Sequence, residues 1–481
     1  MKPGSLRNCI SPEGLRETSA APDVPFEVQL NADNRLRVVR LLRILPGRRL
    51  VGEAWLDHKH VLAKLFVSSA SVRHCKREIE GISRLQRAGI PTPQLVAHGT
   101  LPQGGHFVLT RFLENAESFA DRWRAMLHAP TARGDVVSAL RPIFSLLGKL
   151  HHAGLTHEDL HPGNFLIDDA SYLLIDGDAV RGEPGIGVRM DEATRNLGML
   201  FAQYPMTVED ASRDLLDAYT AGNPAARIDL KTLNTAIDRA RHARWLDYAR
   251  KLKRNCSLFS FERTHRRLLA VERGEQAALA PLIDDPDGWI AKGTALKLGR
   301  TATVSLVKHD GRAWVIKRHN IKNVLHALSR APRPTRAWKS WVEGHRLERL
   351  GIATAIPRAV IESRFGPLRG RAWLISDYIP GVPLSTLLDP DVQPDNETAD
   401  ALTTLFRALA RCRITHGDLK ASNLIWHQGR IHVIDLDATT LHRSEAAFRR
   451  AWARDRNRLM RNWPADSRLV SWLNLNLPPV E

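Results

Sequence analysis

Short apolar runs that each carry one lysine open two similar stretches of the chain. VLAKLF (61–66) and WVIKRH (314–319) have the length and composition of β-strands. Each run precedes a stretch with helical character, KREIEGISRL (76–85) and WVEGHRLERL (341–350), whose glutamates Glu78 and Glu343 stand seven residues before a leucine. The pattern predicts a strand that carries a lysine and a helix that carries a glutamate in each half.

The same order continues downstream. A Gly-Ile-x-Thr turn follows both helices, and then a strand that runs into an apolar segment, FVLTRFLENAESF (107–119) and WLISDYIPGVPL (373–384). Further helices end in LLGKLHHAGL and FRALARCRI. Both halves are therefore predicted to share one order of elements.

A gapless repeat follows these helices. Residues 157–178 read HEDLHPGNFLIDDASYLLIDGD, residues 416–437 read HGDLKASNLIWHQGRIHVIDLD, and the offset is 259 throughout. One His-x-Asp-x4-Asn match is weak evidence. Two copies, each followed by Ile-Asp-x-Asp, indicate two related domains because several independent positions agree.

Length and composition fit this organisation. The chain has 481 residues, 43% hydrophobic and 25% charged, which is ordinary for a globular protein and excludes a disordered or fibrous one. The acidic turn-forming cluster 284–288 predicts the boundary between domains. We expect a mobile tail over residues 1–25, a first domain over 26–283 and a second over 284–481.

The cysteine spacing and the net charge limit the compartment and the partners that are expected for this chain. The four cysteines lie too far apart in sequence for a zinc or disulfide framework, which favours a reducing compartment. The N-terminus lacks a signal-peptide core and no run reaches about 18 apolar residues, so a cytoplasmic location is expected. A net charge of +18 favours an anionic partner such as nucleic acid, an acidic membrane surface or a phosphorylated ligand.

The repeated residues suit phosphoryl transfer, which requires positioning and charge neutralisation more than covalent chemistry. A strand lysine held by a helix glutamate can grip the α- and β-phosphates of ATP, a loop aspartate can accept a hydroxyl proton, and an asparagine with a second aspartate can bind Mg²⁺. This protein-kinase-like set occurs twice, as Lys64, Glu78, Asp159, Asn164 and Asp176 and as Lys317, Glu343, Asp418, Asn423 and Asp435.

Each element also has a plainer interpretation. A lone strand lysine or helix glutamate is usually a solvated surface residue, and Asp and Asn favour turns. His157 and His416, which begin the loops, are interpreted as structural. Gly299, in the segment ALKLGRTATVSLV (295–307), suits a phosphate-covering loop, although neither half has a complete G-x-G-x-x-G. The ordered set in duplicate outweighs the plainer interpretation.

Two departures from protein kinases concern the acceptor. Glu158 and Gly417 replace the arginine of His-Arg-Asp, and no Ala-Pro-Glu segment follows either Ile-Asp-x-Asp. Regulation by loop phosphorylation is therefore not expected. A glycan or small-molecule hydroxyl is favoured over a protein as the acceptor.

The sequence resembles the bacterial lipopolysaccharide core kinases, which phosphorylate heptose or Kdo sugars with ATP. The segments TALKLGRTATV, THGDLKASNLIW, VIDLDA and RDRNRLMRNW of the second half carry the resemblance best. The first half, with GIPTPQLVAHG and HEDLHPGNFLI, is more divergent and is also similar to phosphotransferases of the aminoglycoside kinase type.

The resemblance implies two tandem protein-kinase-like domains of the α+β class, each with a β-rich N-lobe and a mainly helical C-lobe. It implies ATP and Mg²⁺ as cofactors, with Lys64, Glu78, Gly299, Lys317 and Glu343 at the nucleotide. It further implies Asp159 and Asp418 as catalytic bases, with Lys420 at the γ-phosphate, and Asn164, Asp176, Asn423 and Asp435 as metal ligands. His161 stands in the place of Lys420 in the first copy.

The expected partner is a lipopolysaccharide core or another anionic glycolipid, approached at the inner face of the cytoplasmic membrane. A basic arm over 317–339, with seven cations and no acidic residue, suits such a partner, although a solvated charged face is an equally good interpretation. Nucleic acid is not expected because no reader motif accompanies the charge. The open alternatives are a small-molecule phosphotransferase and a scaffold with one inactive domain.

Overall fold

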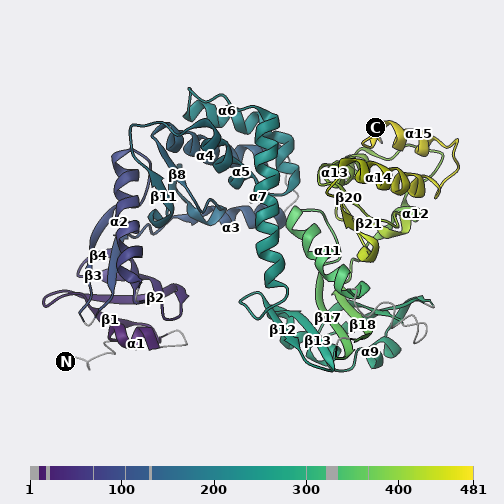
Figure 1. The fold of residues 1–481 in the computed structure, drawn as a ribbon, viewed down its shortest axis with the longest axis horizontal. Helices are drawn as coiled ribbons and strands as arrows, with labels where there is room; N and C mark the ends of the chain where they lie inside the picture. The colour runs from purple at the N-terminus through teal and green to yellow at the C-terminus, as the bar shows by residue number, and fades with distance from the viewer. Residues whose placement is uncertain are drawn as a thin grey trace. The chain divides into compact units, whose positions relative to one another are not determined.

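The computed structural model describes residues 10–17, 22–68, 70–102, 104–128, 133–299, 301–320, 334–366 and 368–479 (Figure 1). The chain forms two compact units that divide between Arg241 and His242, except that residues 204–207 belong to the second unit. Each unit contains a sheet-rich lobe followed by a helical lobe, as the sequence predicted.

The first lobe of unit 1 is an antiparallel sheet with strand order β1-β2-β3-β4-β6-β5. Val61, Ala63 and Leu65 of β4 point to one face of the sheet and are buried there. Because side chains alternate along a strand, Lys64 lies on the opposite face, which α2 covers. The elements are α1 (Pro12–Glu17), β1 (Phe26–Gln29), β2 (Arg35–Leu45), β3 (Arg49–Leu56), β4 (Lys59–Phe66), α2 (Ser71–Arg87), β5 (Leu95–Thr100) and β6 (His106–Arg111).

Part of the predicted mobile tail is ordered. Helix α1 falls inside residues 1–25, and Leu15 on this helix is 2% exposed in the core of the first lobe. An apolar side chain buried this completely fixes the helix against the sheet. Residues 1–9 and 18–21 lie outside the described residues.

The second lobe of unit 1 is mainly helical and carries the first repeat on short strands. Helices α4 and α6 pack closely, and Gly148 and Gly222 allow their backbones to approach. The elements are β7 (Glu117–Ser118), α3 (Phe119–His128), α4 (Arg133–His152), β8 (Leu155–His157), β9 (Phe165–Asp168), β10 (Ser171–Leu174), β11 (Val180–Gly182), α5 (Met190–Phe201) and α6 (Ser212–Gly222), with 3₁₀ turns η1 (Pro162–Asn164), η2 (Gly177–Ala179) and η3 (Met206–Ala211).

The amphipathic helix predicted over 239–254 belongs to a longer helix, α7 (Leu230–Lys251). Leu233 and Ile237 are buried, while most of its charged residues are at least partly exposed. Within the described ranges, neither α7 nor another helix combines the length and the apolar composition that crossing a bilayer requires.

The first lobe of unit 2 begins well before the predicted boundary. Strands β12 (Phe259–Arg263) and β13 (Arg267–Glu272) pair with each other, and β13 pairs with β17, in a seven-stranded antiparallel sheet of order β12-β13-β17-β18-β16-β15-β14. The acidic cluster 284–288 is an internal turn, in which Asp285 caps the next helix by accepting a hydrogen bond from Gly288 N at 2.9 Å. The turn-forming composition identified a helix cap rather than a domain linker.

From β14 to β18 the elements of this lobe follow the order of β2 to β6 in unit 1. The remaining elements of the lobe are η4 (Arg273–Glu275), α8 (Gln276–Asp284), α9 (Pro286–Lys292), β14 (Thr294–Leu298), β15 (Ala302–His309), β16 (Arg312–His319), α11 (Arg336–Leu350), β17 (Pro357–Phe365) and β18 (Leu368–Asp377). The strand and helix predicted from the lysine and glutamate pattern are β16 and α11. Residues 321–333, the centre of the predicted basic arm, lie outside the described residues.

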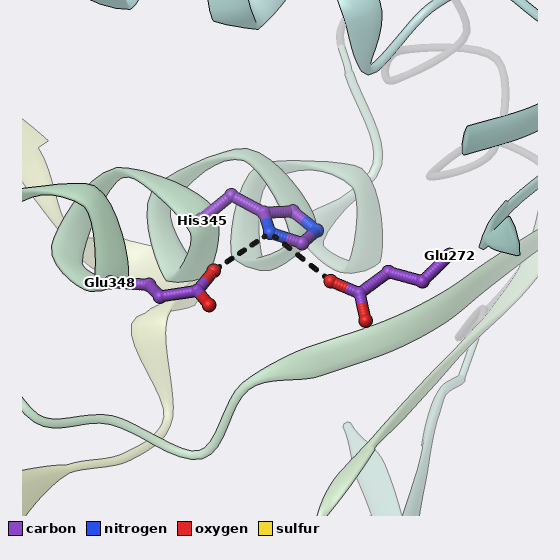
Figure 2. A group of neighbouring side chains, drawn as sticks. All are labelled: Glu272, His345 and Glu348. Carbon is purple, nitrogen blue, oxygen red and sulfur yellow. Dashed lines mark hydrogen bonds and ion pairs between the residues drawn. The ribbon is translucent and has the colours of Figure 1, made fainter. Parts of the chain in front are cut away.

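A charged cluster ties α11 to the sheet. His345 is fully buried, and its Nδ1 lies 3.3 Å from Glu348 Oε2 and 4.0 Å from Glu272 Oε1 (Figure 2). Arg358 pairs with Glu272 on its other side. Burial would raise the pKa of Glu348, but His345 holds that pKa below its usual value. The cluster therefore fixes the helix that carries Glu343.

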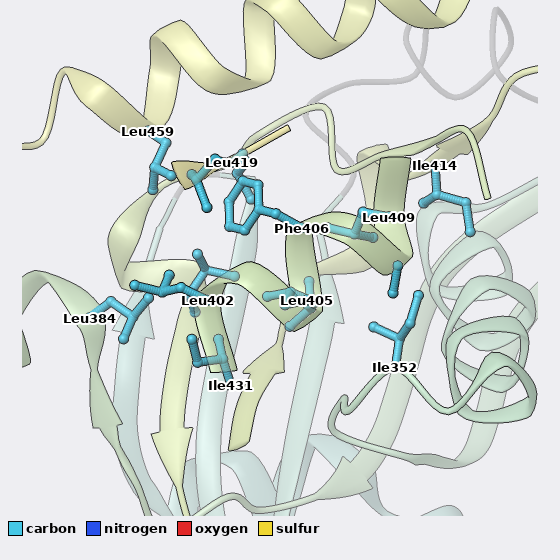
Figure 3. Close-up of a cluster of buried hydrophobic side chains, with 14 of the residues drawn as sticks. Ile352, Leu384, Leu402, Leu405, Phe406, Leu409, Ile414, Leu419, Ile431 and Leu459 are labelled. Carbon is cyan, nitrogen blue, oxygen red and sulfur yellow. The ribbon is translucent and has the colours of Figure 1, made fainter. Parts of the chain in front are cut away.

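The second lobe of unit 2 packs around one apolar core (Figure 3). Phe406 and Leu409 of α13, with Leu459 of α14, contribute fully or nearly fully buried side chains, which hold the repeat loop between them. The elements are β19 (Val382–Pro383), α12 (Leu384–Leu387), α13 (Asn396–Arg411), β20 (Ile414–Thr415), η5 (Ala421–Asn423), β21 (Leu424–His427), β22 (Arg430–Val433), η6 (Leu436–Ala438), β23 (Thr440–Leu441), α14 (Glu445–Met460) and α15 (Arg468–Asn476).

Candidate active sites

The lysine of β4 and the glutamate of α2 form an ion pair in unit 1. Lys64 Nζ lies 2.6 Å from Glu78 Oε1 and 3.4 Å from Asp176 Oδ1. Glu78 is 1% exposed, and a carboxylate this deeply buried stays charged only with a partner. The structure thus brings together three residues that lie far apart in the sequence.

A close backbone contact positions Asp176. The residue has a left-handed backbone (φ 71°) and begins the turn η2, whose Gly177 touches α2. A Cβ on Gly81 of α2 would lie 1.9 Å from Gly177 O, so only glycine fits at that crossing. The helix that carries Glu78 therefore rests directly on the turn that follows Asp176.

The repeat loop of unit 1 is organised by His157. Its Nε2 donates to Ile175 O at 3.2 Å, and its Nδ1 accepts from Asp159 N at 3.3 Å. Burial lowers the pKa of His157, which keeps the ring neutral and suits one donating and one accepting nitrogen. The histidine is therefore structural, as expected from the sequence.

Asp159 and Asn164 lie together on this loop. Asn164 Nδ2 donates to Asp159 O at 2.6 Å, which leaves the amide oxygen of Asn164 available as a ligand. The Asp159 carboxylate is 69% exposed, and His161 Nε2 lies 3.7 Å from its Oδ2. The predicted base of unit 1 is thus an exposed carboxylate whose one ion-pair neighbour among the described residues is a distant histidine.

The surroundings of the Asp176 carboxyl favour its ionised form. Burial would raise its pKa, but Lys64 and then Arg49 outweigh burial and hold the pKa below its usual value. Ile175 N donates to Asn164 O at 3.0 Å, so Asn164 and Asp176 lie on adjoining segments, and an amide oxygen with an ionised carboxylate is an oxygen-donor set that fits Mg²⁺.

Unit 2 departs from the predicted lysine–glutamate pair. Lys317 Nζ contacts Asp435 Oδ1 and lies 3.8 Å from Asp437 Oδ2. Glu343 pairs with Arg346, whose Nε lies 2.8 Å from Glu343 Oε2, and no ion pair joins Glu343 to Lys317 within the described part of the chain. An arginine three residues further along the same helix is a near neighbour of the glutamate and neutralises its charge by pairing with it.

The repeat loop of unit 2 reproduces the hydrogen bonds of unit 1 at an offset of 259. His416 Nε2 donates to Ile434 O at 2.8 Å, and His416 Nδ1 accepts from Asp418 N at 3.3 Å. Asn423 Nδ2 donates to Asp418 O at 2.9 Å. The backbone frame that presents the aspartate and the asparagine is therefore the same in both units.

The surroundings of the two loop aspartates differ. Asp418 is held by two cations, Arg458 Nε at 2.7 Å from Oδ1 and Lys420 Nζ at 3.1 Å from Oδ2. Its side chain is 28% exposed, against 69% for Asp159. The base of unit 2 is thus more enclosed and lies in a positive field.

A pocket of about 500 Å³ opens beside Asp418. Burial would raise the pKa of the lining Asp435, but Lys317 and Lys297 hold it below its usual value. Gly299 stands at the nearby β14–β15 turn, where its N–H donates to Ala302 O at 3.0 Å. That N–H closes the hairpin, so it is not directed at a ligand in this structure. The charged lining residues are Lys297, Lys317, Arg336, Lys339, Asp418, Asp435 and Asp437.

Two supporting residues were missed from the sequence. Asn196 of α5 donates through Nδ2 to His157 O at 2.8 Å, and Asp455 of α14 accepts from His416 N at 2.6 Å and Gly417 N at 3.0 Å. They also stand 259 residues apart, so extending the repeat beyond residue 437 would have found them. Arg346 had no comparable signal, whereas Asp455 and Arg458 lie in the segment RDRNRLMRNW, which carries the family resemblance but was not assigned to the site.

Comparisons with known proteins agree with this geometry. Residues 56–185 match the model of the lipopolysaccharide kinase (Kdo/WaaP) family, and residues 345–462 match the model of the RIO domain. The first segment contains the five predicted site residues of unit 1. The second contains Asp418, Asn423 and Asp435, and it begins after Lys317 and Glu343.

Two individual proteins are similar to parts of the chain. The dual specificity protein kinase Ttk of Danio rerio is 29% identical over 194 residues, which cover 36% of this chain. The chain spans 17% of the length of that relative. A structure of WaaP in complex with acyl carrier protein is 18% identical with a TM-score of 0.34, and the match covers 42% of this chain and 88% of that one.

The duplicated frame and the two matched segments lead to one conclusion. Both matched models describe kinase-like domains, which confirms the predicted α+β fold of two tandem kinase-like domains and the predicted class of ATP-dependent kinase. The chain thus has two kinase-like domains, of which residues 56–185 match the lipopolysaccharide kinase (Kdo/WaaP) family model and residues 345–462 match the RIO domain model.

Proposed function

We propose that this kinase transfers the γ-phosphate of ATP to a hydroxyl of a lipopolysaccharide inner-core sugar, heptose or Kdo. The observation that carries the proposal is the frame around Asp159, Asn164 and Asp176, which is complete in unit 1 and lies inside the segment that matches the lipopolysaccharide kinase family. The family match supports the substrate class, and the geometry supports the reaction type.

The residues of unit 1 take defined roles under this proposal. Lys64, held by Glu78, would contact the α- and β-phosphates, and Asp159 would accept the proton of the sugar hydroxyl. The oxygen of Asn164 and the ionised Asp176 would hold Mg²⁺, which supplies charge neutralisation for the phosphates. The exposed carboxylate of Asp159 leaves room for a large acceptor.

Unit 2 would use Asp418, Asn423 and Asp435 in the same roles. Lys317 contacts Asp435 already and would turn to the phosphates when a metal ion neutralises that carboxylate. Lys420, beside Asp418, would neutralise the transferred γ-phosphate. The basic balance of the chain favours work at an anionic glycolipid on the cytoplasmic face of the inner membrane, with peripheral contact to that membrane.

Lipopolysaccharide analysis tests the substrate. Core oligosaccharides from a deletion strain are compared by mass spectrometry with those from strains that carry the wild type, Asp159→Ala or Asp418→Ala. We expect one core phosphate to be missing in the deletion strain and in Asp159→Ala. Unchanged core phosphate in every strain would overturn the glycan proposal.

Nucleotide binding tests the reaction type independently. Full-length protein is titrated with ATP in the presence of Mg²⁺ and followed by thermal unfolding. We expect stabilisation that weakens in Lys64→Met and persists in Lys59→Met, which removes a lysine from the same strand outside the Glu78 pair. Equal stabilisation of both variants would exclude the assigned role of Lys64. An absence of stabilisation in the wild type would favour the scaffold alternative.

A further inference from the structure

Arg458 of α14 is a neighbour of the predicted catalytic base Asp418 to which the sequence assigned no role. It reaches Asp418 through Nε, at 2.7 Å from Oδ1. Within the described ranges Arg458 forms no ion pair with a residue other than Asp418, and its side chain is 49% exposed. Asp418 Oδ1 has no hydrogen-bond partner among the described residues, so this contact is an ion pair rather than an aligned hydrogen bond, and it leaves the half-exposed guanidinium open to a further anion.

An open arginine fork has a specific chemical partner. The planar guanidinium presents two parallel N–H groups that match the two oxygens of a carboxylate or phosphate. Because the ion pair with Asp418 already holds the guanidinium at the site, less side-chain freedom is lost when it binds an oxyanion. The fork is thus preorganised for an anionic group next to the base.

The local charge also calls for an anion. Arg458 and Lys420 both pair with Asp418, and Arg458 also interacts electrostatically with the buried Asp455, whose pKa burial raises. Under the proposed function, Lys420 faces the transferred phosphate, so Arg458 is the cation left for the acceptor. Asp435 and Asp437, the other acidic residues lining the pocket, are engaged by Lys317, and Arg336 lies 3.9 Å from Asp437.

Unit 1 offers an internal comparison. The position 259 residues before Arg458 is Met199, and the position before Lys420 is His161. Asp159 accordingly has only the histidine at 3.7 Å among its described charged neighbours. Two loops with the same backbone frame thus present different charge to the acceptor.

We propose that Arg458 forms an oxyanion subsite beside Asp418, so that the second site takes an acceptor carrying a carboxylate or a phosphate near the reacting hydroxyl. This inference rests on the proposed function, and it assigns the two sites different acceptors. The second site selects an anionic sugar, and the first lacks this selection. A polycationic acceptor of the aminoglycoside class does not fit the second site.

Binding measurements on the full-length protein test the subsite. The protein carries Asp159→Asn and is saturated with Mg²⁺ and the non-hydrolysable analogue AMP-PNP, so that the γ-phosphate position is filled. Glucose 6-phosphate, glucuronate and glucose are then titrated calorimetrically. We expect at least one of the two anionic sugars to bind and glucose to bind at least about tenfold more weakly. The two anions distinguish a phosphate from a carboxylate subsite.

Matched variants locate the effect. Arg458→Met should weaken binding of the anionic sugar about tenfold, Arg458→Lys should weaken it less, and Arg454→Met, an exposed arginine on the same helix, should leave it unchanged. Equal affinity in Arg458→Met and wild type, or an equal loss in Arg454→Met, would overturn the proposal. So would a wild-type protein that prefers neither anion to glucose.

The outcomes separate this inference from the proposed function. Binding of AMP-PNP is measured first, with Asp435→Asn as the variant that should weaken it. If AMP-PNP does not bind and anion binding still depends on Arg458, the kinase assignment of the second site fails and the anion subsite stands. If AMP-PNP binds and anion binding does not depend on Arg458, the kinase assignment of the second site stands and the anion subsite fails.

Discussion

Asn196 and Asp455 occupy equivalent positions 259 residues apart, and each bonds the backbone of the histidine that begins its repeat loop. The exchange of an amide for a carboxylate changes the bonds. Asn196 donates to His157 O, and its oxygen accepts from His157 N at 3.3 Å. Asp455 only accepts, from His416 N and Gly417 N. Each helical lobe thus holds its loop by one buried side chain.

Removing the Asp455 carboxylate should destabilise unit 2. Asp455→Ala leaves two backbone N–H groups without an acceptor at a residue that is 3% exposed, so we expect a loss of about 2–4 kcal/mol in the free energy of unfolding. Asp455→Asn keeps an acceptor and should lose less. Urea unfolding of the full-length protein measures both. A loss as large in Asp455→Asn would show that charge rather than hydrogen bonding matters there.

The crossing of α2 with the turn after Asp176 should tolerate no added carbon. Gly81→Ala places a methyl group where Gly177 O lies 1.9 Å away, so the helix must shift and carry Glu78 with it. We expect a loss of about 1–3 kcal/mol of stability and a weaker response to ATP. Gly187→Ala, where no atom lies within 4 Å, is the control. Normal nucleotide binding in Gly81→Ala would show that the crossing does not position Glu78.

The glutamates of α2 and α11 should differ in importance. Glu78→Gln removes the charged partner of Lys64, whereas Glu343→Gln removes a residue that pairs with Arg346. We expect Glu78→Gln to lower the turnover of the first site by about tenfold or more, and Glu343→Gln to change the second site little. Each is measured with the other site inactivated, by Asp418→Asn or Asp159→Asn. Equal losses would mean that Lys317 and Glu343 pair during turnover.

Stability of unit 1 should fall in mild acid because of His151. Burial lowers the pKa of His151 from 6.5 to about 4. The neutral ring donates a hydrogen bond through Nε2 to Asn196 Oδ1 at 3.0 Å. Between those pH values the unfolded chain binds a proton that the folded one does not, so stability decreases as pH falls from 6.5 towards 4 and is unaffected above 6.5. The full effect is about 3 kcal/mol.

Calorimetric unfolding between pH 7.5 and about 5 tests this dependence. His151→Gln keeps a donor for Asn196 and removes the titrating group, so its stability should depend less on pH than that of the wild type, even if it is lower throughout. Parallel pH profiles for the two proteins would assign the acid sensitivity to other groups. The buried His157, whose pKa is also lowered, would then be the next to examine.

The sequence predicted the elements that carry the site with small errors at their ends. The run 61–66 became β4 (Lys59–Phe66), and 341–350 became the last two-thirds of α11 (Arg336–Leu350). These two predictions succeeded because strand and helix formation depend on local periodicity. The boundary at 284 failed because Asp285 caps a helix and because β12 pairs with β13, which pairs with β17 about 90 positions away.

The sequence alone determined the two copies, the order of their elements and the hydrogen-bonded loop of each, because those bonds join residues within one short gapless segment. Only the tertiary structure decided which charges meet. Lys64 pairs with Glu78, whereas Glu343 pairs with Arg346. Arg458 pairs with Asp418, which lies 40 residues before it in the sequence. Ion pairs between elements depend on how helices and sheets pack, and packing is set by the whole core rather than by a local pattern.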